Sequence, residues 1–321
     1  MCYGLDDRKA LAMARAGRAP SRRAMLRGAA LGALGAGALA ATGVAAAPTA
    51  QARPGGGWGR VRIPRNRISI QLYTVRDALN GDPGFDESLR HIAGLGYPRV
   101  EQALGFFGRT AEELRDFYRE LGIRATSSHN DLSEDEDALR TKLRDARTLG
   151  QSYLNVPYLD SDDADEWRRF AERMNNEAAK ARRYGLRYGY HNHAHEFTKD
   201  LGGGLTPWDI LTGELDPRLV HLEIDIHWTV TAGIESGDGV DDPEQYTIDV
   251  IRSAPQRVLQ FHVKDRDPET GDTSDPGTGM IDFPRIFRAH TVREYIVEND
   301  TPDVTPLHSA DVGWAYLRGL R

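Results

Sequence analysis

Short runs of β-type residues recur along the chain, and each of them ends at or near a polar residue. In the C-terminal half these runs are LRYGYH, VHLEID, VLQFH and EYIVE. Their last residues are His191, Asp225, His262 and Glu298, which lie 34, 37 and 36 residues apart. A strand, a helix and the next strand need about 30 residues or more, so this spacing predicts repeated strand–helix units.

The N-terminal half continues the pattern at shorter intervals. The runs are RISIQLYTV, PRVEQA, IRATSSH and SYLNVP. They place Gln71, Glu101, His129 and Asn155 at or near strand ends, with gaps of 30, 28 and 26 residues. The sequence therefore contains eight strand candidates, each with a polar residue near its C-terminal end.

The segments between these runs have helical patterns. DESLRHIAGLG ends in Gly96, a usual C-cap, and Thr110 is followed by Glu113, which predicts a capping box. In SEDEDALRTKLRDARTLG we expect Ser133 to be the N-cap, with acidic residues in the first turn. Alternating strands and helices predict the α/β class, and eight such units predict a single (β/α)8 TIM barrel over residues 67–321.

The first 52 residues differ in composition and are expected to lie outside the barrel. SRRAMLR at 21–27 matches a twin-arginine export signal, an Ala- and Gly-rich stretch follows at 28–47, and AQA at 50–52 is a small-x-small cleavage site. About 20 apolar residues can also span a bilayer, but this stretch is only weakly hydrophobic. We therefore expect a cleaved signal, no stable membrane anchor, and export by the twin-arginine machinery to the periplasm or outside the cell. Residues 53–66, which include RPGGGWGR, are expected to be a linker.

Removal of the signal changes the charge of the chain. The full sequence has 41 basic and 48 acidic residues and a net charge of −7. The first 52 residues carry seven basic and two acidic residues, so the mature chain has 34 against 46 and a net charge of −12. Such a surface repels phosphate backbones, which argues against a nucleic-acid partner. Cys2 is the only cysteine and is lost with the signal, so the mature chain has no disulfide and no thiol ligand.

The polar residues that end the last four strands indicate metal chemistry. Strand ends of a (β/α)8 barrel converge on its C-terminal face, which holds the active site. Two His, one Asp and one Glu converging there make a ligand set for a divalent ion, namely His191, Asp225, His262 and Glu298. Simpler structural interpretations are a helix N-cap for Asp225, a core histidine bonded to the backbone for His262, and a salt bridge to Arg293 or another nearby arginine for Glu298.

Histidines cluster at the end of the fifth predicted strand. His191, His193 and His195 form HNHAH, and continued strand alternation would place all three on one face. Three histidines on one face, followed by Glu196, favour a functional site over ordinary structural hydrogen bonding.

Longer motifs resemble a known family. ISIQLYTVRD, GYPRVEQA, YGLRYGYHNHAHEF, LEIDIHWTVTAG, FHVKDRD, GTGMIDFPRIF and YIVEND resemble the sugar phosphate isomerase/epimerase family of the xylose isomerase-like TIM barrel superfamily, over residues 67–320. The resemblance implies one Mn²⁺, Mg²⁺, Co²⁺ or Zn²⁺ ion held by Glu, Asp, His and Glu at the ends of strands five to eight. Asp225, His262 and Glu298 match the last three ligands. His191 stands where sugar epimerases generally have Glu, so Glu196 is an alternative fourth ligand.

The same resemblance implies acid–base chemistry. Family epimerases use two carboxylates to move a proton beside a carbonyl, and here Glu298 is expected to be one acid/base, with His193 or Glu196 as the second. Apart from the resemblance, the charge of Lys264 could neutralise an oxyanion or a carboxylate. Two His with two carboxylates suit Mn²⁺ or Zn²⁺ better than Ca²⁺. The remaining polar strand ends and one aromatic ring are expected to bind the substrate: Gln71, Glu101, His129, Asn155 and Trp228.

Two further features of the sequence are open to more than one interpretation. Trp228 offers a platform for a sugar face, but ordinary packing under a loop is an equally simple explanation. The Gly-, Pro- and Asp-rich segment 265–279 is expected to be either a lid or a disordered loop.

These features predict a divalent-metal-dependent isomerase or epimerase that removes a proton next to the carbonyl of a non-phosphorylated sugar. No phosphate cradle is visible, and a sugar phosphate is an awkward substrate outside the cytoplasm. One alternative is a metal-dependent lyase or hydrolase that acts on a 3-keto-glycoside or C-glycoside through the same enolisation. Another is an exported carbohydrate-binding protein without turnover. A DNA-repair endonuclease would need more metal ligands and a basic face.

Overall fold

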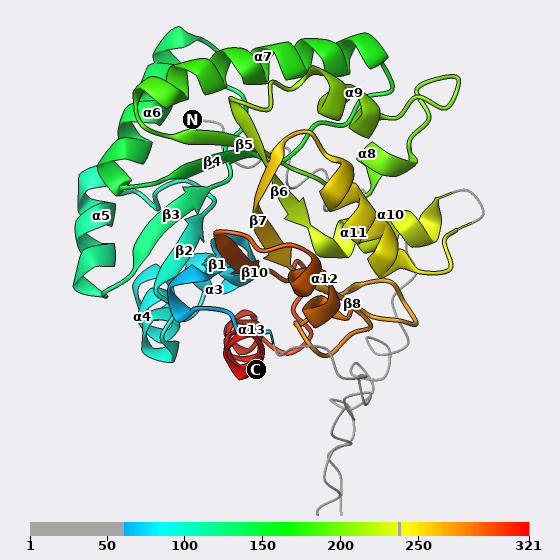
Figure 1. Ribbon diagram of the computed structural model, residues 1–321. Helices are drawn as coiled ribbons and strands as arrows, with labels where there is room; N and C mark the ends of the chain where they lie inside the picture. The colour runs from blue at the N-terminus through cyan, green and yellow to red at the C-terminus, as the bar shows by residue number, and fades with distance from the viewer. Residues whose placement is uncertain (1–60, 237–238, 321) are drawn as a thin grey trace, which may run out of the picture. The chain divides into compact units, whose positions relative to one another are not determined.

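The computed structural model describes residues 61–236 and 239–320, and eight parallel strands form its main sheet. The sheet order is β3, β2, β1, β10, β7, β6, β5 and β4. A backbone bridge between His129 and Asn155 joins the two ends of this order, so the sheet closes into a barrel (Figure 1). The prediction of a single (β/α)8 barrel is confirmed. The strands are β1 (Ile68–Gln71), β2 (Arg99–Gln102), β3 (Arg124–Ser128), β4 (Tyr153–Val156), β5 (Arg187–His191), β6 (Val220–Asp225), β7 (Arg257–Val263) and β10 (Glu294–Val297).

Helices connect successive strands on the outside of the barrel (Figure 1). Among the described residues, no helix combines the length and the apolar character that crossing a membrane requires. Short 3-10 turns, η1 (Arg65–Arg67) and η2 (Leu72–Val75), flank β1. The helices are α3 (Arg76–Asn80), α4 (Phe85–Leu95), α5 (Ala111–Glu120), α6 (Glu136–Leu149), α7 (Ala164–Arg183), α8 (His195–Thr198), α9 (Pro207–Glu214), α10 (Ile226–Glu235), α11 (Pro243–Ser253), α12 (Phe283–Ala289) and α13 (Pro306–Gly319).

Local capping residues set several helix ends where the sequence predicts them. Helix α4 ends at Gly96, whose φ of 106° is favourable only for glycine. Helix α5 begins with the full capping box, in which the side chains of Thr110 and Glu113 each accept a backbone N–H from the other residue. Both predictions are confirmed.

The expected N-cap of α6 is wrong by two residues. Asp135 caps this helix by accepting the N–H of Ala138 over 2.8 Å. Ser133 instead donates its backbone N–H to Glu177 over 2.7 Å. Glu177 lies on α7 and also pairs with Lys142 over 2.7 Å, largely shielded from solvent. A buried carboxylate needs several hydrogen-bond donors. Ser133 supplies one of them to Glu177, and therefore it does not cap α6.

Buried polar side chains fill the inside of the barrel. Along β7, Gln260 and His262 belong to the polar interior, whereas Phe261 and Val263 belong to the hydrophobic core under the helices. Gly189 of β5 has no side chain at a point where an added Cβ would overlap Asn155 Oδ1 and the ring of His221. The interior is therefore packed across the barrel and holds its polar groups at fixed positions.

The expected export signal at 1–52 lies outside the described residues, as does most of the expected linker at 53–66. The described chain begins at residue 61, and the side chain of Ile63 is already buried in the core. The signal and the linker stay predictions.

Candidate metal centre

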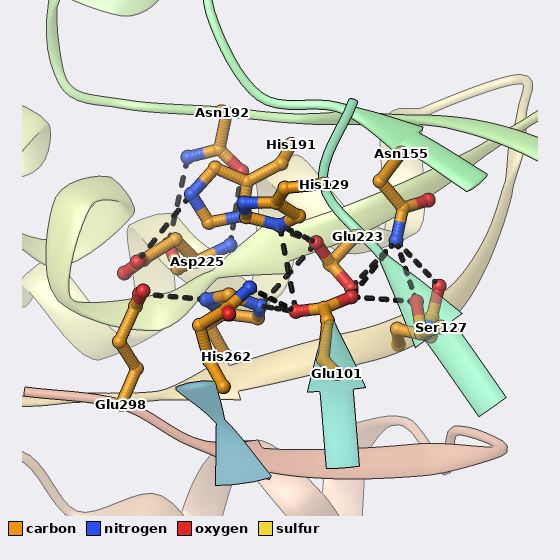
Figure 2. Close-up of polar contacts among 12 residues, drawn as sticks. Glu101, Ser127, His129, Asn155, His191, Asn192, Glu223, Asp225, His262 and Glu298 are labelled. Carbon is orange, nitrogen blue, oxygen red and sulfur yellow. Dashed lines mark hydrogen bonds and ion pairs between the residues drawn. The ribbon is translucent and has the colours of Figure 1, made fainter. Parts of the chain in front are cut away.

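Four side chains from four neighbouring strands meet at the C-terminal end of the barrel (Figure 2). They are the predicted ligands His191, Asp225, His262 and Glu298, and all four are buried. One ligand atom from each lies within 4.8 Å of the others. The strand register brings them together, because Asp225 of β6 lies beside His262 of β7. We call these four residues the Asp225 set.

Asp225 occupies two roles at once. Strand β6 ends at this residue and α10 begins at the next. Its Oδ1 accepts the backbone N–H of Trp228 over 3.0 Å, which is the N-cap bond considered above as an alternative. Its Oδ2 lies 3.0 Å from Lys264 Nζ and faces the other members of the set. The cap therefore orients the carboxylate and leaves one oxygen for the centre.

His262 stands between carboxylates on both sides of its ring. Its Nδ1 lies 2.7 Å from Glu298 Oε2, and its Nε2 lies 2.7 Å from Glu101 Oε2. Burial opposes protonation of His262, but the charges of Glu223, Glu298 and Glu101 outweigh it and hold its pKa well above the usual range. The backbone-bonded core histidine considered above does not describe these ring contacts.

The other members of the set have pKa values shifted by burial and by charge. Burial and the nearby charge of His262 lower the pKa of His191 to about 3, so this imidazole is neutral and able to ligate. Burial raises the pKa of Asp225 to about 6 against the opposing effect of Lys264. Burial also disfavours the charged form of Glu298, yet Lys264 and His262 hold its pKa well below the usual range.

The donor chemistry of these residues fits a divalent cation. Three carboxylates, on Asp225, Glu298 and Asp300, lie within 3.0 Å of the single ammonium of Lys264. A divalent ion that took the place of the proton on His262 would bring further positive charge to these buried carboxylates. Two imidazoles and two carboxylates are a usual ligand set for first-row transition ions.

The histidine cluster departs from the expected strand geometry. Strand β5 ends at His191, and His195 already begins α8, so the expectation of one strand face for all three histidines is wrong. Nevertheless, the ring of His193 lies 5.2 Å from that of His191, centroid to centroid. Its Nδ1 is buried and has no hydrogen-bond partner within the described part of the chain. His195 Nε2 instead contacts the carbonyl of Leu159 over 2.7 Å.

Glu196 is fully buried and makes two strong hydrogen bonds. Its Oε1 accepts from the hydroxyl of Tyr190 over 2.6 Å, and its Oε2 accepts from the backbone N–H of His193 over 2.8 Å. Both carboxylate oxygens are thus engaged in holding the loop that carries His193.

The expected substrate-binding residues lie at different depths. Gln71, Glu101 and Asn155 are fully buried, and they bond to one another through Glu101, with Gln71 Nε2 donating to Glu101 Oε2 over 2.8 Å. His129 is less buried and places Nε2 2.7 Å from Glu223 Oε2. The first three form a polar layer beneath the centre, while His129 lies at its rim.

Lys264, which is fully buried, and Trp228 lie against each other beside the centre. The Lys264 ammonium lies 5.4 Å from the centroid of the Trp228 ring, and the ring of His193 lies 5.6 Å from it. Trp228 Nε1 is buried and finds no hydrogen-bond partner in the residues that are described. The ring therefore contacts two of the candidate catalytic groups.

Two residues of the site escaped the sequence reasoning. Glu223 lies two residues before Asp225 on β6, and Asp300 lies two residues after Glu298. Asp300 Oδ2 is 2.9 Å from Lys264 Nζ, and Glu223 Oε2 is 3.3 Å from both His191 Nδ1 and His262 Nε2. Strand alternation from Asp225 would have found Glu223, whereas Asp300 lies beyond the end of β10 at Val297 and has no such signal.

The segment 265–279 folds as a small hairpin beside the barrel mouth. Strands β8 (Asp265–Arg266) and β9 (Thr273–Ser274) pair antiparallel. The buried carboxylate of Asp265 accepts backbone N–H groups from Gly277, Gly279 and Ile281. These bonds tie the segment down, so the expected disordered loop is not what the structure contains.

A cavity of about 620 Å³ lies at the opposite end of the barrel. Its lining includes Arg67, Arg257 and Arg293, which precede or begin β1, β7 and β10. It contains none of the candidate ligands, so it has no part in the chemistry of the centre.

Comparisons with known proteins agree with this architecture. The sequence model of the "Xylose isomerase-like TIM barrel" family matches residues 89–296. An inosose dehydratase from Bacillus licheniformis is 25% identical over 237 residues, which cover 68% of this chain and 70% of that protein.

Two solved structures with the same fold are a sugar phosphate isomerase/epimerase and a protein with a bound zinc atom. A sugar phosphate isomerase/epimerase from Parabacteroides distasonis is 20% identical, with a TM-score of 0.65 over 80% of this chain and 94% of that one. The IOLI protein, solved with a zinc atom bound, is 13% identical, with a TM-score of 0.58 over 79% of this chain and 98% of that one. At these identities the solved structures show a shared fold. The family model, which matches residues 89–296, covers more than half of the chain. The chain therefore belongs to the xylose isomerase-like TIM barrel family.

Proposed function

We propose that this protein is a divalent-metal-dependent sugar isomerase or epimerase, acting on a non-phosphorylated sugar by removing a proton next to its carbonyl. The observation that carries the proposal is the convergence of His191, Asp225, His262 and Glu298 at the barrel mouth. Active sites of (β/α)8 enzymes lie at this face. Mn²⁺ or Zn²⁺ suits this set best, with Mg²⁺ and Co²⁺ as other candidates.

Each neighbouring side chain has a role in this scheme. A bound divalent ion would polarise the sugar carbonyl and stabilise an enediolate. Glu298, whose pKa is held low by Lys264 and His262 despite its burial, is ionised at neutral pH and accepts the proton. Lys264 Nζ neutralises negative charge that develops beside Glu298, 2.7 Å away. His193, with its unpartnered ring nitrogen, acts on the other side of the substrate.

The fourth ligand is assigned to His191 rather than to Glu196. His191 is neutral, buried and within the set, whereas both oxygens of Glu196 already accept hydrogen bonds. Glu196 therefore positions His193 and its loop. Gln71, Glu101 and Asn155 keep a supporting role from below, and His129 and Trp228 are the residues best placed to contact sugar hydroxyls and a sugar face.

A lyase is the second candidate, and the match to an inosose dehydratase favours it. Removal of the same proton would be followed by breakage of the C–O bond on the adjacent carbon, and the leaving oxygen would take up a proton. A 3-keto-glycoside would lose its glycosidic oxygen in this way. Carbohydrate binding without turnover is the remaining alternative.

One experiment separates these functions. The metal content of the purified protein is measured, and the protein is then incubated in D₂O with a panel of ketoses and 3-keto-glycosides. Deuterium uptake beside the carbonyl with an intact skeleton supports the isomerase or epimerase, and uptake with loss of a glycosidic or hydroxyl group supports the lyase. Thermal protection by sugars without any exchange would contradict both enzymatic proposals.

Replacing His193 with alanine is expected to lower turnover while leaving the metal content unchanged. His193 lies outside the Asp225 set, and its Nδ1 has no hydrogen-bond partner among the described residues. If it transfers a proton, the loss should be about a hundredfold. His195→Ala is the matched control, because His195 contacts a backbone carbonyl instead. Loss of the ion in His193→Ala would show that this residue serves the metal.

Export by the twin-arginine route is a separate proposal, because the signal lies outside the described residues. Replacing Arg22 and Arg23 with lysine is expected to retain the protein in the cytoplasm, since the route reads the arginine pair. Cell fractionation and N-terminal sequencing measure this, and the exported form should begin near Arg53. Normal export of the double-lysine variant would point to another route.

A further inference from the structure

His191 and His262 each face two different groups of ligands with their two ring nitrogens. His262 Nδ1 lies 2.7 Å from Glu298 Oε2, whereas its Nε2 lies 3.3 Å from Glu223 Oε2. His191 Nε2 lies 3.8 Å from Asp225 Oδ2, whereas its Nδ1 lies 3.3 Å from Glu223 Oε2. Figure 2 shows the two rings between these carboxylates. One nitrogen of each ring belongs to the Asp225 set, and the other points away from it.

The nitrogens that point away meet a second set of donors. His129, His191, Glu223 and His262 bring one ligand atom each within 4.8 Å of one another. His129 Nε2 lies 2.7 Å from Glu223 Oε2, and its ring is stacked on that of His262 at a centroid distance of 5.1 Å. We call these four residues the Glu223 set. It has three imidazoles and one carboxylate, and it shares His191 and His262 with the Asp225 set.

An unpartnered buried atom points into this second set. The side chain of His191 is 3% exposed, and its Nδ1 makes no hydrogen bond of acceptable geometry with any described residue. It nevertheless faces Glu223 Oε2. A buried imidazole nitrogen whose single contact is this long and poorly aligned is costly, and a cation coordinated by both His191 Nδ1 and Glu223 Oε2 would satisfy it.

Neighbouring groups hold the Glu223 set in place and balance a cation. Asn155 Nδ2 donates to Glu223 Oε1 over 2.8 Å, which leaves Oε2 facing the three imidazoles. Glu101 Oε2 lies 2.7 Å from His262 Nε2 and brings a second buried negative charge. A divalent ion held by the Glu223 set would lie beside both of these buried carboxylates.

We propose that the Glu223 set is a second position for a divalent transition-metal ion, distinct from the Asp225 position. The proposal rests on the proposed function only in that the barrel mouth binds divalent ions. The Glu223 set has more imidazoles than carboxylates, which suits Zn²⁺ or Co²⁺. A neutral imidazole has one lone pair, so each of the two shared rings serves one position at a time. Removal of ligands found only in the Asp225 set should therefore move the ion and not release it.

The test compares three forms of the full-length protein: the wild type, Asp225→Asn/Glu298→Gln, and the same variant with His129→Gln and Glu223→Gln added. Each is stripped with chelator, reconstituted with Zn²⁺ or Co²⁺, and measured for bound metal and for the Co²⁺ absorption spectrum. The double variant is expected to keep about one ion per chain, with a spectrum shifted towards nitrogen-rich coordination. The fourfold variant is expected to bind none. If it does not fold, as judged by circular dichroism, His129→Gln alone in the double-variant background replaces it and should weaken binding at least tenfold.

The outcomes separate this inference from the proposed function. A wild type that binds no divalent ion contradicts the proposed function and the second position together. A wild type that binds an ion while the folded double variant binds none overturns the second position alone. An unchanged spectrum and full occupancy in the fourfold variant would place the ion elsewhere, which also overturns the inference.

Discussion

Replacing His262 with alanine is expected to abolish divalent-metal binding. His262 is shared by the Asp225 and Glu223 sets, so its removal takes one ligand from every ion position at the barrel mouth. It also removes the group that lies 2.7 Å from both Glu101 and Glu298. Breaking a buried ion pair by removing one partner costs about 3–5 kcal/mol, so the metal-free variant should also be less stable by roughly this amount.

Elemental analysis and denaturant unfolding of the metal-free protein measure the two effects. His221→Gln is the matched control, because His221 is also a buried histidine of the barrel interior but belongs to neither set. Its metal content should equal that of the wild type. His262→Gln keeps a polar side chain and serves if the alanine variant does not fold. Full metal occupancy in a folded His262 variant would rule out both ion positions.

The fold could be predicted because polar residues recur near the ends of the predicted strands at the interval of one strand–helix unit. The intervals of 34, 37 and 36 residues between His191, Asp225, His262 and Glu298 correspond to strands that are neighbours in the barrel. Their convergence follows from parallel topology and needs no knowledge of loops or packing. The same reasoning holds for the capping box at Thr110, because both of its bonds are local.

Features that depend on tertiary contacts were beyond the sequence. The end of β5 at His191 could not be read from HNHAH, because alternating polar residues fit either a strand or a loop. Ser133 left its expected cap to bond Glu177, a residue 44 positions away. A local sequence pattern predicts which residue caps a helix only when no distant group competes for the same hydrogen-bond donor.

The depth at which each polar residue lies within the barrel could not be predicted from the sequence either. Glu101 and Asn155 are the next-to-last residues of their strands, as His262 is, yet they are bonded to each other in a layer below the centre. The tilt and stagger of the strands decide which residue near a strand end reaches the mouth of the barrel. The stagger depends on how the strands pair, so it cannot be predicted from the sequence of one strand. Glu223 was overlooked for a different reason: strand alternation places it on the same inner face of β6 as Asp225, but only the residue at the strand end was considered.

Replacing Glu298 with glutamine is expected to lower turnover by at least about a hundredfold, the low end for the loss of a general base. The amide cannot accept the proton beside the sugar carbonyl, and deuterium exchange from solvent should fall by the same factor. Glutamine has nearly the shape of glutamate, and its oxygen remains available 2.7 Å from Lys264 Nζ. Exchange is therefore measured at saturating metal, so that weaker ion binding is not mistaken for a lost base.

Glu294→Gln provides the control on the same strand. Glu294 begins β10 at the other end of the barrel, pairs with Arg99 over 2.5 Å and is fully buried. Burial raises its pKa to about 7, so near neutral pH the amide imitates a form that the wild type already populates. This variant should keep exchange close to the wild-type rate, because Glu294 lies outside both ligand sets. If Glu298→Gln also kept exchange within about tenfold of the wild type, well short of what loss of a base costs, Glu298 would be a metal ligand only. The proton would then have to pass to His193, the second acid/base of the proposed function.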